Sequence, residues 1–194
     1  MRVETCVLEG RHVRLEPLTL DHWPQLSRIG LDEELWRWTT SRIATPEDMR
    51  RYIETAVDWQ AQGMALPFAT VERSSGCAVG STRFAAIDPV NRRVEIGWTW
   101  VAPPWQRTPI NTEAKYLMLR HAFEELGCIR VELKTNSLNT RSRNAILRIG
   151  AKEEGVFRNH MINDDGTIRH TVYYSIIDSE WPDVKARLEE KLQQ

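Results

Sequence analysis

The chain has 194 residues, of which 41% are hydrophobic and 27% charged, and its formal net charge is −1. This balance predicts one globular domain whose core is large enough to fold without disulfides, and it excludes a disordered chain. A net charge so close to zero provides no field that would gather nucleic acid or an acidic membrane surface.

The cysteines indicate a reducing environment. Cys6, Cys77 and Cys128 stand far apart and form neither a CxxC pair nor a metal-ligand spacing. We therefore expect a cytoplasmic protein with no disulfide framework and no metal. The first five residues lack the apolar core of a signal peptide, and no later apolar run is long enough to cross a bilayer, so we expect no membrane contact.

The N-terminal half predicts two helices and four strands. Its strongest helix start is Thr45, which can cap, followed by Pro46 and two acids that complement the helix dipole. In chain order, the expected elements are a strand at 11–16, a short helix around 23–29 closed by Gly30, a helix from Thr45 to about Gly63, and strands at 66–73, 78–87 and 92–102.

The C-terminal half continues with a long helix that Gly127 closes. In chain order, the expected elements are that helix at about 109–126, a strand at 129–135, a helix at 140–149, hairpin strands at 152–162 and 167–177, and a final helix capped by Ser179. Without repeats or linkers, the pattern predicts a single domain of the mixed α/β (α+β) class, with a central, mostly antiparallel sheet flanked by helices.

Residues 95–111 read EIGWTWVAPPWQRTPIN, and this segment resembles the acetyl-CoA-binding core of the GNAT superfamily of N-acetyltransferases. The following NTEAK sequence, residues 111–115, is similar to the RimJ/RimL-like branch. The resemblance covers nearly the whole order of elements. It implies acetyl-CoA as co-substrate, and a strand before the main helix that diverges from its neighbour and exposes backbone groups to the pantetheine arm.

The family's loop pattern, Gln/Arg-x-x-Gly-x-Gly/Ala, aligns with Gln106 to Asn111, where neither glycine is present. Free amides and the dipole at a helix N-terminus suit a diphosphate, and Arg107 can add a charged contact. Pro109 has no amide to donate, which costs about 1.5–3 kcal/mol if the acceptor is charged. Alternatively, Thr108-Pro109 is only a helix start. The resemblance implies these cofactor residues here: Trp100, Val101, Ala102, Gln106, Arg107, Thr108, Pro109, Ile110, Asn111 and Thr112.

A second match lies at residues 136–150, NSLNTRSRNAILRIG, which resembles the superfamily helix that meets pantetheine and adenosine. The resemblance implies contacts from Asn139 and Ser142, and one of three arginines, Arg143 among them, can reach the 3′-phosphate. The alternative is a capped amphipathic helix with a solvated basic face.

Acetyl transfer to an amine needs a base and a proton donor for the leaving thiolate. Glu95 is the candidate base, because several superfamily members place a catalytic glutamate at this spacing from the loop, and apolar neighbours would raise its pKa. The alternative is a solvent-facing Glu95 paired with Arg93 or Arg83. The tyrosine that many relatives use as the acid is absent, which leaves Ser142, a water, Tyr173 or Tyr174 open.

The segment between the first two helices usually walls the acceptor pocket in this superfamily. Trp36 and Trp38 lie in it, either as substrate-binding aromatics or as packing residues. His121 fits a packed helix face, and His160 and His170 lie near the expected hairpin turn, either exposed or beside an acceptor.

We therefore expect an N-acetyltransferase that moves acetyl from acetyl-CoA to a primary amine, on a peptide N-terminus or a small molecule. Two other functions stay open: a CoA-binding regulatory module without turnover, and a structural or dimerisation domain without ligand. Homodimers are frequent among members of the family, although no residue here argues for one.

Overall fold

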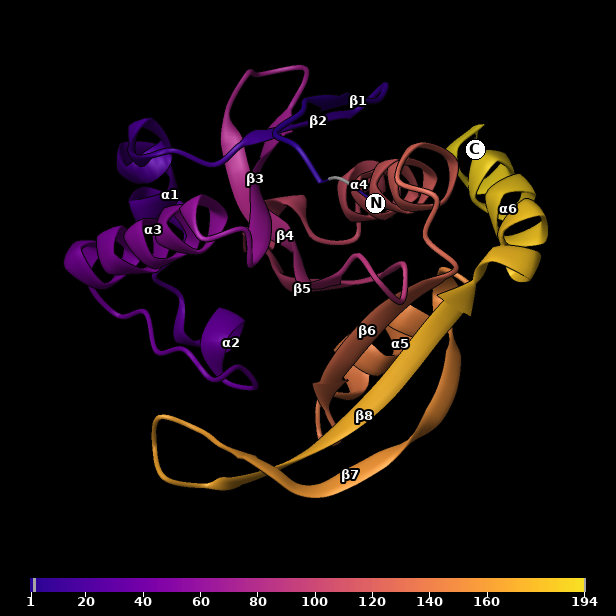
Figure 1. Ribbon diagram of the computed structural model, residues 1–194. Helices are drawn as coiled ribbons and strands as arrows, with labels where there is room; N and C mark the ends of the chain where they lie inside the picture. Colours follow the sequence, from indigo (N-terminus) through magenta and orange to yellow (C-terminus); the bar gives the residue numbers. More distant parts are fainter. Residues whose placement is uncertain (2, 194) are drawn as a thin grey trace.

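One sheet runs through the computed structural model, which describes residues 1 and 3–193 (Figure 1). Its strands are β1 (Leu8–Glu9), β2 (Val13–Pro17), β3 (Ala65–Glu72), β4 (Ala78–Asp88), β5 (Arg93–Val101), β6 (Arg130–Asn136), β7 (Lys152–Ile162) and β8 (Ile168–Ile177). They lie in the order β1-β2-β3-β4-β5-β6-β8-β7. Every neighbouring pair is antiparallel except β5 and β6, which are parallel, so the predicted mixed, mostly antiparallel sheet is confirmed.

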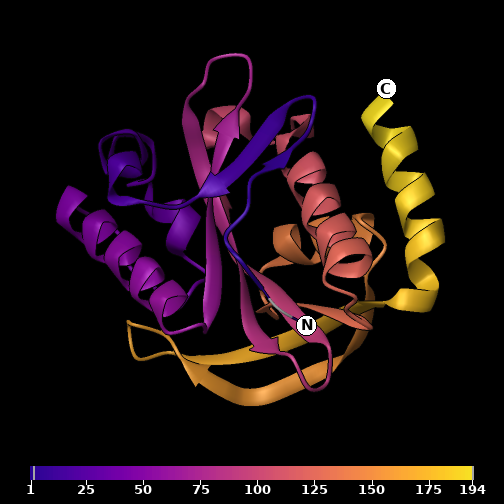
Figure 2. The same cartoon turned by 45° about the horizontal axis from the view of Figure 1, so that its top comes forward.

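Helices cover both sides of this sheet. They are α1 (Trp23–Ile29), α2 (Glu33–Trp36), α3 (Pro46–Ala61), α4 (Pro109–Arg120), α5 (Thr140–Arg148) and α6 (Trp181–Gln193). Figure 2 shows α1 and α3 on one side of β3 and β4, with α4 and α6 on the other. A π-helical turn, His121–Glu125, continues α4 to the end predicted for that helix.

The structure differs from the sequence prediction at three short elements. Neither β1 nor α2 was predicted, because two and four residues are too short to establish a period. The predicted cap at Ser179 is wrong: this residue lies inside a 3₁₀ turn, and α6 begins after it at Trp181. The Glu180 carboxylate accepts the Ile177 amide at 3.2 Å and closes the turn.

Alternation along the strands separates an apolar face from a polar face. On β5 and β6, Val94, Ile96, Val131 and Leu133 point toward the core under α4. Their neighbours in sequence point to the opposite face. The polar side chains that share that face include the half-buried Lys134 and the buried Ser81, Arg83, Glu95, Glu132, Asn136, Arg169, Thr171 and Ser175. Burying so many polar groups side by side is costly, which makes this polar face the place to look for function.

Two segments from distant parts of the chain border the polar face. A second apolar core, formed by α1 to α3 against small residues of β3 and β4, fixes α3 against β3 and α1 against β4. The β7–β8 hairpin reaches the segment before α3, and the Arg42 amide donates to the Asp164 carboxylate at 2.9 Å. Figure 1 shows the tip of the hairpin below α2.

Candidate active site

The N-terminus of α4 begins as its sequence predicts. Thr108 is extended at the N-cap position, accepts the Ile110 amide at 3.4 Å and donates its hydroxyl to the Trp105 carbonyl at 2.6 Å. Within the described chain, the amides of Arg107, Thr108 and Asn111 have no hydrogen-bond acceptor. The first turn of α4 contains no acid, so its positive end is not neutralised.

The loop before α4 takes its shape without glycine. Arg107 adopts a left-handed conformation with φ of 62°, whereas Pro109 and Asn111, which align with the family's glycines, lie inside the helix. A left-handed non-glycine residue stores about 1 kcal/mol of strain. The one place in this loop where the backbone benefits from glycine is therefore two residues earlier than the pattern indicates.

The side chain of Gln106 links three elements. Its amide nitrogen donates to the Val101 carbonyl at 2.8 Å, and its oxygen accepts Arg141 of α5 at 3.1 Å. Gln106 therefore shapes the loop, because both the amide nitrogen and the oxygen of its side chain are hydrogen-bonded within the protein.

At α5, Asn139 caps the helix by accepting the Ser142 amide at 3.0 Å, as in the alternative of a capped amphipathic helix, and a cofactor contact from Asn139 stays a prediction. The Ser142 hydroxyl makes no hydrogen bond to any described residue. Arg143 is held by the Tyr174 hydroxyl, the Ser137 carbonyl and Glu153, so its reach toward a 3′-phosphate stays a prediction.

β5 and β6 diverge toward the C-terminal end of β5, which leads through a short loop into α4. They pair only from Arg93 to Glu95 on β5, and the rest of β5 has no partner on that side among the described residues. A bulge in β5 accompanies the divergence, because the register with β4 shifts and Trp98 has a φ of 47°. The V-shaped opening that the family resemblance implied is present, and Trp100, Val101 and Ala102 form its edge and end.

Glu95 lies at the apex of this opening and is only 3% exposed. Lys134 of β6 pairs with it at 2.8 Å, so the alternative of a solvent-facing Glu95 paired with Arg93 or Arg83 is wrong. Burial raises the pKa of Glu95, and the Lys134 ammonium opposes that rise. Gly97 provides the space for the carboxylate, since a Cβ there would lie 2.7 Å from Oε1.

The two tryptophans in the segment between α1 and α3, where the resemblance implies an acceptor pocket, differ in exposure. Trp36 is 6% exposed, donates to the Gly30 carbonyl at 2.7 Å and packs on Tyr52 and Trp100, as in the packing alternative. Trp38 is half-buried, with the Arg37 guanidinium 5.1 Å from its ring centre. A role for either ring in substrate binding stays a prediction.

The other residues named as candidates fall into two groups. Tyr174 is fully buried with its hydroxyl on Arg143, while its neighbour Tyr173 faces the polar side and stacks on Phe157. His121 packs against Phe84, as expected, and His160 contacts the edges of Phe157 and Tyr173. Of these four residues, Tyr173 and His160 therefore lie near the polar face, while His170 is exposed and accepts the Asn159 amide at 2.8 Å.

Sequence reasoning missed two buried charges of α4. Lys115 is 7% exposed and donates to the Thr99 hydroxyl at 2.6 Å, and burial lowers its pKa to about 7. Glu113, also buried, accepts the amides of Arg11, His12 and Val13 at 2.6–2.8 Å and so anchors the β1–β2 turn. The sequence offered one clue to their burial, since both residues lie between apolar residues of the same predicted helix.

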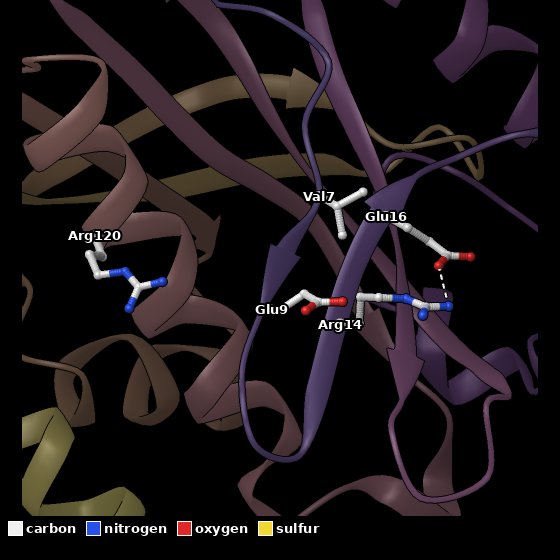
Figure 3. Close-up of a pocket in the computed structure, with 5 residues that line it drawn as sticks. All are labelled: Val7, Glu9, Arg14, Glu16 and Arg120. Carbon is white, nitrogen blue, oxygen red and sulfur yellow. Dashed lines mark ion pairs between the residues drawn. The ribbon is translucent and has the colours of Figure 1, made fainter.

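A surface depression lies away from this site. Val7, Glu9, Arg14, Glu16 and Arg120 line it at the β1–β2 edge, and Figure 3 shows Arg14 and Glu16 paired there. Most of the residues that line it are charged, with acids and arginines side by side, and none of them belongs to the start of α4. In the part of the chain that the structure describes, no cluster of three or more His, Cys, Asp or Glu side chains could hold a metal, and no helix is long and apolar enough to cross a membrane.

Comparison with known proteins decides the family. A family model described as an acetyltransferase (GNAT) domain matches residues 12–152. The chain belongs to the GNAT acetyltransferase family. Acetyl transfer from acetyl-CoA is the chemistry of this family, so the predicted fold and acyl-CoA-dependent N-acetyltransferase class are confirmed.

Relatives support this GNAT assignment along nearly the full chain. The chain is 33% identical over 171 residues to YdaF of Bacillus subtilis (strain 168), named as a candidate ribosomal N-acetyltransferase, covering 86% of this chain and 90% of YdaF. It is 25% identical over 138 residues to the ribosomal-protein-serine acetyltransferase of Escherichia coli (strain K12), covering 71% and 75% of the two chains.

Solved structures agree with this GNAT fold. A GCN5-related N-acetyltransferase from Brucella melitensis matches with a TM-score of 0.91 and 34% identity, covering 98% of this chain and 86% of that one. RimJ of Mycobacterium smegmatis, solved in complex with CoA-disulfide, matches with a TM-score of 0.79 and 25% identity, covering 92% and 88%. The predicted RimJ/RimL-like resemblance is confirmed.

Proposed function

We propose that this GNAT protein transfers acetyl from acetyl-CoA directly to a primary amine in the opening between β5 and β6. One arrangement supports the proposal. The two strands diverge at Glu95, and β5 then leads into the N-terminus of α4, whose positive dipole end no acid of the first turn neutralises. The free amides of Arg107, Thr108 and Asn111 suit a diphosphate, and the unpaired edge of β5 suits the amide groups of pantetheine. We infer cofactor contacts from Asn139 and Ser142 as well, because Arg141 of the same helix is bonded to Gln106 in the loop before α4.

In the proposed step, the amine lone pair attacks the thioester carbon and the carbon–sulfur bond breaks. The nitrogen proton passes to the Glu95 carboxylate, directly or through a water, and the electron pair leaves on the CoA sulfur. Lys134 holds Glu95 in place at 2.8 Å and favours its charged form. The unpaired Ser142 hydroxyl is the candidate proton donor to the leaving thiolate.

The acceptor that the relatives favour is a peptide or protein N-terminus. The Escherichia coli relative is named for acetylation of a ribosomal protein, and YdaF carries a similar name. A small-molecule amine is the second candidate, because the half-buried Trp38 and Tyr173 offer aromatic surface for one. A cytoplasmic location and a homodimer stay predictions, as does the absence of nucleic-acid and membrane partners.

The test combines binding with turnover. Isothermal titration with acetyl-CoA comes first, followed by thiol release over peptides, polyamines and amino acids. Glu95→Gln should lower kcat about 100-fold or more and leave CoA affinity unchanged, because it removes the base alone. Glu125→Gln, an exposed change on the π-helical turn, is the matched control.

The pH profile tests the role of Glu95 further. Burial raises the pKa of Glu95, so the wild-type rate should rise with pH along a limb above the ordinary carboxyl value of 4.5, and Glu95→Gln should lack that limb. Binding of acetyl-CoA without thiol release on any amine would instead support the regulatory module. An absence of binding at millimolar acetyl-CoA would contradict both.

A further inference from the structure

Arg83 on β4 is a buried cation without an anion. Its side chain lies on the polar face and the residue is 2% exposed. Among the described residues, no carboxylate, hydroxyl or carbonyl accepts a hydrogen bond from its guanidinium. A guanidinium carries five N–H donors, and no Arg83 nitrogen is both fully buried and unpaired, so its unused donors lie where solvent or a ligand can reach them. The site therefore lacks a partner for Arg83.

Three aromatic rings hold this guanidinium. Its Cζ lies 5.0 Å from the ring centre of Tyr52, 5.4 Å from Trp59 and 5.1 Å from Trp98. Ring faces stabilise a cation without consuming its N–H donors. The cage thus fixes the position of the charge and leaves its hydrogen-bonding edge available.

The surroundings of Arg83 are short of negative charge. Lys134 shares the Trp98 ring at 5.9 Å and pairs with Glu95. Among the described residues, Arg169 of β8, 7% exposed, has only the Thr171 hydroxyl at 3.1 Å as a hydrogen-bond partner. Glu132, the other acid of this face, is bound by Arg93 and Arg130 at the strand ends. Among the described residues, Lys134 and Arg169 are the cations that act on the Glu95 carboxylate, and Arg83 pairs with no acid at all.

We propose that Arg83 binds a carboxylate of the acceptor, so that the preferred substrate is a primary amine carrying a carboxylate close to the amino group. The inference rests on the proposed acetyl transfer, because it assigns the polar face to the acceptor. An Arg–carboxylate pair is bidentate and planar, and it would use the donors that the aromatic cage leaves free. It would also bring the charge near Glu95 into balance.

The carboxylate can come from two sources, which matched acceptors separate. In the peptide arm, Ser-Asp-amide is compared with Ser-Asn-amide, which differs only in the acidic side chain. In the amino-acid arm, free serine is compared with serine amide. We expect the acid of at least one pair to have a kcat/KM roughly 10- to 100-fold higher than its amide.

Variants assign this preference to Arg83. Arg83→Met should abolish the preference by lowering kcat/KM for the acid alone, and Arg83→Lys should retain part of it. Arg120→Met is the matched control, because Arg120 also lies over an aromatic ring, 5.5 Å from Tyr116, but on α4 at the opposite side of the sheet. Circular dichroism checks that each variant is folded. An equal kcat/KM within both wild-type pairs, or a preference that survives in folded Arg83→Met, would overturn the proposal.

A binding measurement separates this inference from the proposed function. If no amine is acetylated, the acetylated Ser-Asp-amide and Ser-Asn-amide peptides are titrated calorimetrically into the CoA-loaded protein. Saturable binding of the acidic peptide to wild type, lost in Arg83→Met, would support the carboxylate site although acetyl transfer had failed. Equal binding of the two peptides, or no binding of either, would refute it.

Discussion

Two helices of this protein, α3 and α4, begin with the same Thr-Pro pair, but the charge and the free amides at their N-termini differ. At α3, Asp48 turns back on the start of the helix and accepts the amides of Ala44 and Thr45 at 3.1 and 2.8 Å, while Thr45 accepts the Asp48 amide at 3.1 Å. This capping box satisfies the free donors and places a negative charge on the positive end.

At α4 the residue in the place of Asp48 is Asn111. Its amide has no acceptor and its buried side-chain oxygen has no donor among the described residues. The first acid of α4, Glu113, is turned toward the β1–β2 turn. One side chain in the third helical position therefore decides whether a helix start closes on itself or stays available for an external anion.

The largest effect should come from the acid that α4 directs elsewhere. Glu113→Gln should lower the free energy of unfolding by about 3–5 kcal/mol, because a buried carboxylate that accepts three backbone amides is lost. Urea denaturation measures the loss, with the exposed Glu125→Gln as control. If stability is kept and CoA affinity changes instead, Glu113 serves the helix start and the contrast with α3 is mistaken.

The next effect concerns Lys115, which α4 buries without a carboxylate. Lys115→Met should raise the free energy of unfolding at pH 7 by about 2–3 kcal/mol, because wild type must neutralise or bury a charge there. Burial lowers the pKa of Lys115 to about 7 from 10.5, so in this window the unfolded chain binds the extra proton. Wild-type stability should therefore rise with pH between about 7 and 10.5, and the advantage of the variant should shrink over the same range. A gap independent of pH would show that Lys115 titrates normally.

A smaller effect is expected from the loop that leads into α4. Arg107→Gly should raise the free energy of unfolding by about 0.5 kcal/mol, because it relieves the left-handed backbone but adds freedom to the unfolded chain. The same change should weaken CoA binding several-fold by removing a phosphate contact. Thermal unfolding and calorimetric titration read the two effects separately. Tighter CoA binding would mean that backbone strain, rather than charge, limits this loop.

The sequence was sufficient for most elements and for the place of the opening. The Thr-Pro starts and the strand periods depend on neighbouring residues, and these predicted α3, α4 and β5 to within a few residues. The partners of Glu95 and Arg83 were not predictable, because they depend on which strands become neighbours. Lys134 reaches Glu95 only through the parallel pairing of β5 and β6, and two separate segments, α3 and β5, form the cage around Arg83.

The most direct test gives α4 the acid that α3 already has. Asn111→Asp should build a capping box at α4 and place a negative charge where the diphosphate is proposed to bind. Calorimetric titration should then find CoA bound at least ten-fold more weakly, in a protein at least as stable as wild type. The reciprocal Asp48→Asn should leave CoA affinity unchanged. Wild-type affinity in Asn111→Asp would contradict the claim that the open start of α4 holds the diphosphate.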